Sequence, residues 1–104
     1  MAQDALAELE LIPQENLNEE ELSYFNLLVT EAKYKLYESF TSDSIIETSI
    51  SYYEKHLNNI NKHKYFRSLI FCGAVNEELG NYNKAVYLYN KAENCIPDSS
   101  YYWM

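Results

Sequence analysis

The side chains of this sequence best suited to chemistry are two cysteines, Cys72 and Cys95, and two histidines, His56 and His63. Their spacing matches neither C-x-x-C nor a known zinc-ligand pattern. Nothing in the sequence sets a histidine beside Cys72 as the base that a cysteine nucleophile needs. Both cysteines fall on apolar helix faces, where cysteine packs as a small hydrophobe, and we predict that role. A shared zinc ion and a disulfide are the alternatives.

Carboxylates are numerous, but their pattern places them on solvated helix faces. An acid–base catalyst would instead need a carboxylate in an apolar pocket that raises its pKa. The sequence contains only two glycines, and no glycine-rich loop that would cradle a phosphate is present. We therefore expect no enzyme activity, no catalytic residue, no cofactor and no metal.

The charge of the chain limits its partners. Acidic side chains outnumber basic ones by 16 to 8, which gives a net charge of −8 and disfavours nucleic acid. Residues 1–21 hold seven acids and no base, and we expect a solvated surface there, with an acidic docking surface as the alternative. No apolar run reaches the roughly 18 residues of a membrane span, and no signal peptide is recognisable. We expect a soluble segment without membrane contact, from a cytoplasmic or an envelope-attached parent protein.

Helices must position these residues, because apolar side chains recur at intervals of three and four almost throughout. The two glycines and two prolines also leave too few turns for an all-β fold. The pattern predicts a leading helix ended by Pro13 and further helices over about 19–39, from 44 to a break at 58–62, and over about 62–79 and 82–95. The predicted apolar stripes of the first three helices are Ala5, Leu6, Leu9 and Ile12; Leu22, Phe25, Leu28, Ala32 and Leu36; and Ile46, Ile50, Tyr53 and Leu57.

Cap residues mark the predicted helix ends. Asn18 with Glu21, and Ser44 with Glu47, have the spacing of a capping box. Gly80 predicts a C-terminal stop, and the residue after it, an asparagine, can cap the last helix. The sequence therefore predicts an all-α chain with one leading helix and two antiparallel helix pairs.

Small and aromatic residues in the second pair form a ladder with intervals of twelve, four, three and five residues. Its members are Gly73, Ala85, Tyr89, Ala92 and Pro97. Small side chains at these places let two antiparallel helices approach closely, and the proline closes the second helix. This ladder resembles the tetratricopeptide (TPR) repeat, a helix–turn–helix unit of 34 residues. Trp103 stands 34 residues after Leu69, where a further repeat would place its tryptophan.

The first helix pair follows the repeat pattern less closely. Ala32 takes the place of Gly73 and Tyr53 that of Tyr89, but Ala32 and Gly73 are 41 residues apart. The resemblance implies an α–α superhelix, a TPR-like solenoid segment cut from a larger bacterial-type protein. Its expected parts are a leading helix or cap (1–17), a TPR-like hairpin (18–60), a TPR hairpin (61–98) and the start of a truncated repeat (99–104).

In the TPR family, the first helix of each pair lines a concave groove that holds a partner peptide. The resemblance places that face at Asn26, Val29, Lys33, Tyr37, Arg67, Ile70, Ala74 and Glu77. It implies a non-catalytic interaction or scaffold module that binds a protein or peptide. A ligand-sensing segment of a bacterial signalling or transcriptional regulator is the alternative. We also expect that the open repeat end can self-associate.

Overall fold

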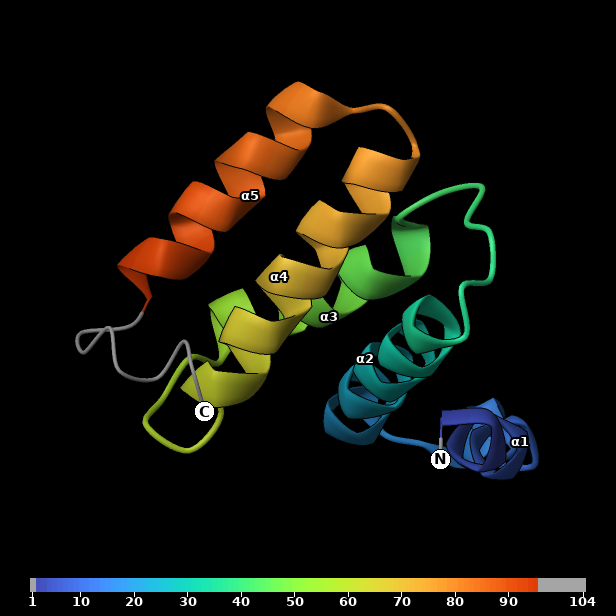
Figure 1. Ribbon diagram of the computed structural model, residues 1–104. Helices are drawn as coiled ribbons and strands as arrows, with labels where there is room; N and C mark the ends of the chain where they lie inside the picture. The colour runs from blue at the N-terminus through green and yellow to red at the C-terminus, as the bar shows by residue number, and fades with distance from the viewer. Residues whose placement is uncertain (1, 96–104) are drawn as a thin grey trace.

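A computed structural model describes residues 2–95, and the secondary structure of this part of the chain is entirely helical (Figure 1). The elements are α1 (Ala2–Glu10), the short 3₁₀ helix η1 (Gln14–Asn16), α2 (Glu19–Lys35), α3 (Ser44–Lys55), α4 (Lys62–Glu78) and α5 (Tyr82–Asn94). The all-α prediction is confirmed. The predicted repeat positions Pro97 and Trp103, and the predicted truncated repeat at 99–104, lie outside the described residues.

Two helix ends form as predicted. At the start of α2, the Asn18 side chain accepts a hydrogen bond from the Glu21 N–H (2.8 Å), and the Glu21 side chain accepts one from the Asn18 N–H (3.0 Å). This reciprocal capping box satisfies two amide groups that the helix leaves without partners. Helix α4 stops before Gly80, which adopts a left-handed φ of 83° that glycine tolerates without steric cost.

Helix α2 is shorter than predicted. It ends at Lys35 rather than near Ser39, because Tyr37 adopts a left-handed φ of 59°. The N–H groups of Tyr37 and Glu38 donate back to carbonyls of the last turn, which is the hydrogen bonding of a Schellman motif. A tyrosine thus ends α2 with the geometry that Gly80 gives to α4.

Two predicted side-chain caps do not form. Helix α3 begins at Ser44 itself, so the preceding Asp43 occupies the N-cap position, and no side-chain cap forms at this helix end. The Ser44 N–H instead donates to the Ser42 hydroxyl (3.0 Å). Asn81 does occupy the N-cap of α5, but its side chain donates to Asn76 Oδ1 (3.2 Å) rather than accepting from the helix. A competing polar partner has replaced the local cap in both places.

The helices pack in chain order, and α2 also packs against α4. The side-chain contacts that join α2 to α4 include Tyr24 with Lys64, Glu31 with Arg67, and Tyr34 with Phe71. The partners advance together along both helices, so α2 and α4 run parallel. Helices α4 and α5 form an antiparallel pair, and α1 lies at the opposite end of the molecule from α5 (Figure 1).

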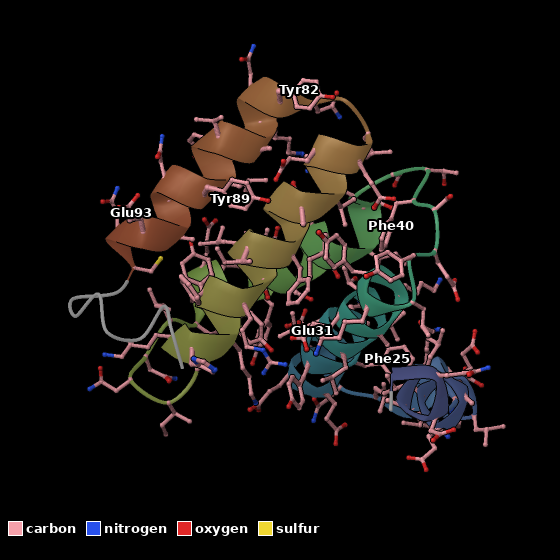
Figure 2. The ribbon with its side chains drawn as sticks, viewed as in Figure 1. Phe25, Glu31, Phe40, Tyr82, Tyr89 and Glu93 are labelled. Atoms are coloured by element: carbon pink, nitrogen blue, oxygen red, sulfur yellow. The ribbon has the colours of Figure 1, made fainter. Side chains whose placement is uncertain are left out.

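The two helix pairs, α2–α3 and α4–α5, make their close contacts through different kinds of residue. In the second pair, the Tyr89 ring of α5 lies over Gly73 of α4 (Figure 2), and a Cβ atom on Gly73 would lie 2.6 Å from that ring. In the first pair, the Ser49 hydroxyl of α3 donates to the Ser23 carbonyl of α2 (2.7 Å). Ala32 is buried, but it lines a space between α1 and α2. Ala32 was expected to allow close approach of α2 and α3, as Gly73 does for α4 and α5, but it faces α1 instead.

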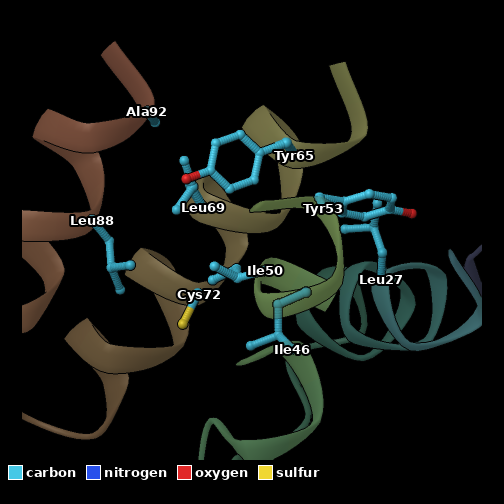
Figure 3. Close-up of a cluster of buried hydrophobic side chains, with 9 residues drawn as sticks. All are labelled: Leu27, Ile46, Ile50, Tyr53, Tyr65, Leu69, Cys72, Leu88 and Ala92. Atoms are coloured by element: carbon cyan, nitrogen blue, oxygen red, sulfur yellow. The ribbon is translucent and has the colours of Figure 1, made fainter. Parts of the chain in front are cut away.

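The core lies between α3, α4 and α5, with Leu27 reaching it from α2 (Figure 3). The predicted α3 stripe of Ile46, Ile50 and Tyr53 is 1%, 6% and 1% exposed, which confirms its orientation. Leu57, predicted as the next member, is 52% exposed because α3 has ended before it. Helices α4 and α5 complete the buried cluster with Tyr65, Leu69, Cys72, Leu88 and Ala92.

Candidate functional site

The predicted partner-binding residues of α4 share one side of that helix. Arg67 and Ile70 are half-buried, Ala74 is buried and Glu77 is exposed. The Glu77 carboxylate accepts a hydrogen bond from the Tyr89 hydroxyl of α5 (2.5 Å). This half of the predicted face thus presents Arg67, Ile70 and Glu77 at least in part, while Ala74 is covered.

The predicted residues of α2 and its following loop do not join that surface. Asn26 is buried, and its side-chain amide donates to the Thr48 hydroxyl of α3 (2.8 Å). Val29 and Lys33 line a cavity of about 230 Å³ between α2 and the 39–46 segment. Tyr37 lies beyond the helix end and is 93% exposed. Packing of α2 against α1 and α4 explains the difference, because it turns the Asn26 side of α2 toward α3.

Another side of α2 forms a groove with α1, and we call it the α1–α2 groove. It encloses a cavity of about 300 Å³. Apolar and charged side chains line it together: Ala5, Glu8, Leu9 and Ile12 from the N-terminal segment, and Leu28, Glu31, Ala32 and Lys35 from α2. An apolar floor with a few charged groups at its edge suits a polypeptide that carries both kinds of side chain.

Glu31 connects the α1–α2 groove to α4. Its carboxylate, labelled in Figure 2, accepts a hydrogen bond from Arg67 Nε (2.7 Å) and forms an ion pair with the same guanidinium. Ile70 lies one turn further along α4. Further along both helices, the rings of Tyr34 on α2 and Phe71 on α4 pack edge to face, with their centroids 5.8 Å apart. Through Glu31, the groove therefore borders the Arg67 side of α4, where part of the predicted face is exposed.

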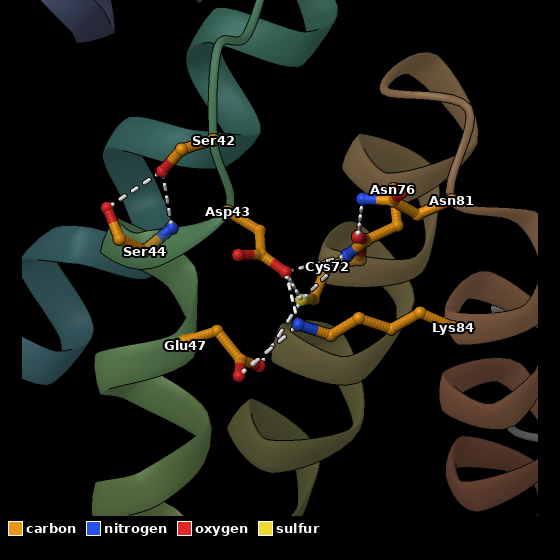
Figure 4. Close-up of polar contacts among 8 residues, drawn as sticks. All are labelled: Ser42, Asp43, Ser44, Glu47, Cys72, Asn76, Asn81 and Lys84. Atoms are coloured by element: carbon orange, nitrogen blue, oxygen red, sulfur yellow. Dashed lines mark hydrogen bonds and ion pairs between the residues drawn. The ribbon is translucent and has the colours of Figure 1, made fainter.

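A second cluster of polar side chains joins α3, α4 and α5 (Figure 4). Lys84 Nζ lies 2.6 Å from Asp43 Oδ2 and 3.6 Å from Glu47 Oε2. The side-chain amide of Asn76 donates to Asp43 (2.9 Å) and to the Cys72 carbonyl (2.8 Å). Burial alone would raise the pKa of Asp43, but the hydrogen bonds from Lys84 and Asn76 outweigh it and lower that pKa below its usual value. The Lys84 ammonium therefore supplies the positive charge that these carboxylates require.

Cys72 lies beside the two carboxylates of this cluster. Its sulfur is 3.5 Å from Glu47 Oε1 and 3.8 Å from Asp43 Oδ2, and the side chain is fully buried. Burial, together with the negative charges of Glu47 and Asp43, raises the pKa of the Cys72 thiol well above its usual range. A thiol in such surroundings stays protonated and is a poor nucleophile. Three potential ligand atoms, from Asp43, Glu47 and Cys72, lie within 4.8 Å of one another, but the Lys84 ammonium already forms ion pairs with both carboxylates.

The other residues weighed for chemistry lie apart from this cluster. Cys95 is half-buried at the end of α5, and its thiol donates to the Lys91 carbonyl (3.2 Å). Cys72 and Cys95 are both free, so they form no disulfide. The His56 ring stacks on Tyr52, with centroids 4.5 Å apart, and His63 is exposed on α4. These four residues do not assemble into a metal site among residues 2–95.

A further ion pair links α3 to α5. Glu54 accepts hydrogen bonds from Lys91 and from the Tyr65 hydroxyl, the latter at 2.8 Å. These bonds lower the pKa of Glu54, although partial burial opposes them. Together with the Lys84 pairs, this contact holds α5 against α3 at both ends of α5.

Sequence reasoning did not predict the α1–α2 groove. It assigned Leu9, Ile12, Leu28 and Ala32 to apolar stripes but not to a surface groove. Glu31 and Lys35 follow the same stripe at helical spacing, so the signal was present in the sequence. The sequence did not indicate where α1 packs. In the structure, α1 covers only part of this side of α2.

Among the described residues, none of the helices is both long and apolar enough to cross a bilayer. Comparison with protein-family models, curated proteins and solved structures finds no match for this chain. The function is therefore inferred from the surface of the structure alone.

Proposed function

We propose that this chain is a non-catalytic protein–protein interaction module, a TPR-like solenoid segment that binds a partner polypeptide in the α1–α2 groove. Two features support the repeat arrangement. The first helices of the two pairs, α2 and α4, run parallel, and the second helices carry apolar stripes of equal spacing. Ile46, Ile50 and Tyr53 recur on α5 as Tyr82, Val86 and Tyr89, 36 residues later.

The observation that carries the binding proposal is the α1–α2 groove, whose lining residue Glu31 pairs with Arg67 of α4. Its apolar floor gives a partner hydrophobic contact area. Glu8 and Lys35 supply charged groups at its edge. The ion pair with Arg67 of α4 holds the side chain of the third charged residue, Glu31, in place. A preordered surface of this kind loses little conformational entropy on binding.

The non-catalytic part of the proposal is supported by the chemistry around Cys72. Its thiol is buried, protonated and flanked by carboxylates, and the nearest cation, Lys84, is held by Asp43. This arrangement stabilises the contact of three helices rather than activating a nucleophile. The ligand-sensing alternative stays a prediction.

Two charge reversals on the same helix test the location of the binding surface. Lys35 lines the α1–α2 groove, whereas Lys33 lines the cavity beside the 39–46 segment. Peptides selected from a display library against the whole chain serve as probes, and their affinities are measured by fluorescence anisotropy. We expect Lys35→Glu to weaken the selected peptides about tenfold, a loss of about 1.4 kcal/mol, and Lys33→Glu to leave affinity nearly unchanged.

The reverse result, with loss only in Lys33→Glu, would move the binding surface to the originally predicted side of α2. Failure to select any peptide against a chain whose helicity and cooperative unfolding are intact would contradict the interaction module itself.

A further inference from the structure

Helix α5 carries an apolar stripe that the described residues leave largely uncovered. Tyr82 and Val86 are 66% and 58% exposed, and Tyr89 is half-buried where its ring crosses Gly73. These three residues follow one another at intervals of four and three, so they share one side of the helix. Helix α5, which carries the stripe, lies at the opposite end of the molecule from α1 (Figure 1).

Helix α3 carries a stripe of the same spacing, and the structure shows what covers it. On α3, Ile46, Ile50 and Tyr53 have the same intervals and are almost fully buried. The segment that follows α3 covers them: Leu69 and Cys72 of α4 belong to the same buried cluster (Figure 3).

The connection after α3 also shows how soon the chain can return. Tyr65 stands ten residues after Lys55, the last residue of α3, and its hydroxyl donates to Glu54 in the last turn of α3 (2.8 Å). Tyr65 is 4% exposed. A connection of this length is therefore sufficient to bring an aromatic side chain back onto the preceding helix.

A comparable connection follows α5. Trp103 stands nine residues after Asn94, the last residue of α5, in the sequence IPDSSYYWM (96–104). From Cys95 to Trp103 the chain can span up to roughly 26 Å when extended. Val86 lies about 14 Å back along the helix from Cys95, at 1.5 Å per residue. The aromatic triplet Tyr101, Tyr102 and Trp103 is thus within reach of the stripe.

We propose that the stripe of Tyr82, Val86 and Tyr89 is the docking face for the segment 96–104 of the same chain, with Tyr101, Tyr102 and Trp103 as its apolar cover. This contact covers the stripe of α5 as α4 covers that of α3. The stripe on α5 and the α1–α2 groove are different surfaces, so a test of one does not decide the other.

Trp103 reports on this contact because it is the only tryptophan of the chain. Its emission is recorded with excitation at the red edge of tryptophan absorption, where the eleven tyrosines contribute little. The isolated peptide 96–104 serves as the reference for a solvated tryptophan. We expect the whole chain to emit at shorter wavelength than the peptide and to be quenched less by acrylamide.

Two matched variants locate the contact. Val86→Asp puts a charge in the middle of the stripe, and Leu11→Asp puts one on an apolar residue that is 83% exposed near α1, at the other end of the molecule. Both side chains are exposed, so neither variant is expected to disturb the core. We expect Val86→Asp to shift the emission toward that of the peptide and Leu11→Asp to leave it unchanged.

Three results would overturn the proposal. The first is peptide-like emission from the whole chain, and the second is a blue-shifted emission that Val86→Asp does not change. The third is a blue shift that disappears on dilution, since it would assign the cover to a second copy of the chain.

Discussion

The two helix pairs, α2–α3 and α4–α5, carry the same apolar stripe on their second helix but treat it differently. On α3 the stripe is buried beneath α4, whereas on α5 most of it remains exposed. The tyrosines that end the stripes differ accordingly. Tyr53 is buried with its hydroxyl unpaired, while the Tyr89 hydroxyl donates to Glu77 at the surface. A shared sequence spacing therefore fixes which side of the helix is apolar, and the neighbouring helix decides how deeply that side is buried.

A close contact within each pair is also made in two ways. The pair α4–α5 places a bare Cα, at Gly73, beneath an aromatic ring. The pair α2–α3 joins two buried serines by a hydrogen bond from Ser49 to the Ser23 carbonyl. Steric fit governs the first contact and polar pairing the second, so substitutions should affect the two pairs differently.

The largest effect is expected at the Gly73–Tyr89 contact. Gly73→Val places branched carbon atoms where even a Cβ would lie 2.6 Å from the ring, and we expect a loss of about 1–3 kcal/mol in unfolding free energy. Urea unfolding followed by circular dichroism measures it. In a Tyr89→Ala background most of this penalty should vanish. A penalty of equal size in both backgrounds would contradict the contact.

Removing one hydroxyl from each pair should have opposite effects. Tyr53→Phe deletes a buried hydroxyl without a partner, and we expect a gain of about 1 kcal/mol in unfolding free energy. Burial also raises the pKa of Tyr53 to about 12, so the wild-type chain should lose stability as the pH rises above 10, and Tyr53→Phe should reduce that loss. Tyr89→Phe removes the bond to Glu77 and should cost about 1 kcal/mol. Equal signs for the two substitutions in urea unfolding would refute the contrast.

Effects of the same size or smaller are expected at the ends of α2 and α4, each of which has one residue in the left-handed conformation. Gly80→Ala should cost about 1 kcal/mol, because a Cβ is strained at φ 83°. Tyr37→Gly should stabilise the chain by about 0.5 kcal/mol, since relief of the same strain exceeds the added entropy of the unfolded chain. Thermal unfolding of the two variants provides the measurement. A loss of stability in Tyr37→Gly would show that the tyrosine side chain contributes to this helix end.

Much of the local structure was predictable because it depends on neighbouring residues in the sequence. The capping box of Asn18 and Glu21, the stop at Gly80 and the stripe from Ile46 to Tyr53 all form as expected. The end of α2 was not predictable in this way, because a tyrosine rarely adopts the left-handed conformation that ends this helix. The cap expected at Ser44 failed because the helix begins at that residue, one position earlier than a Ser44 cap predicts, and Asp43 occupies the N-cap position.

The candidate site was predictable only in part. The sequence proposed one face across α2 and α4, and its α4 members Arg67, Ile70 and Glu77 are at least partly exposed. On α2, the expected Asn26 is turned toward α3, and Glu31 and Lys35 lie in the groove instead. Helical spacing relates residues within one helix, but it does not give the rotation of that helix about its own axis relative to others.

The sequence by itself determined that this chain is helical and which side of each helix is apolar, since both follow from spacing and caps over a few residues. The tertiary structure decided which apolar sides meet, that Cys72 lies beside two carboxylates, and that a groove opens between α1 and α2. These outcomes depend on contacts between residues far apart in the sequence, such as Lys84 with Asp43 and Arg67 with Glu31, and local patterns carry no information about such distances.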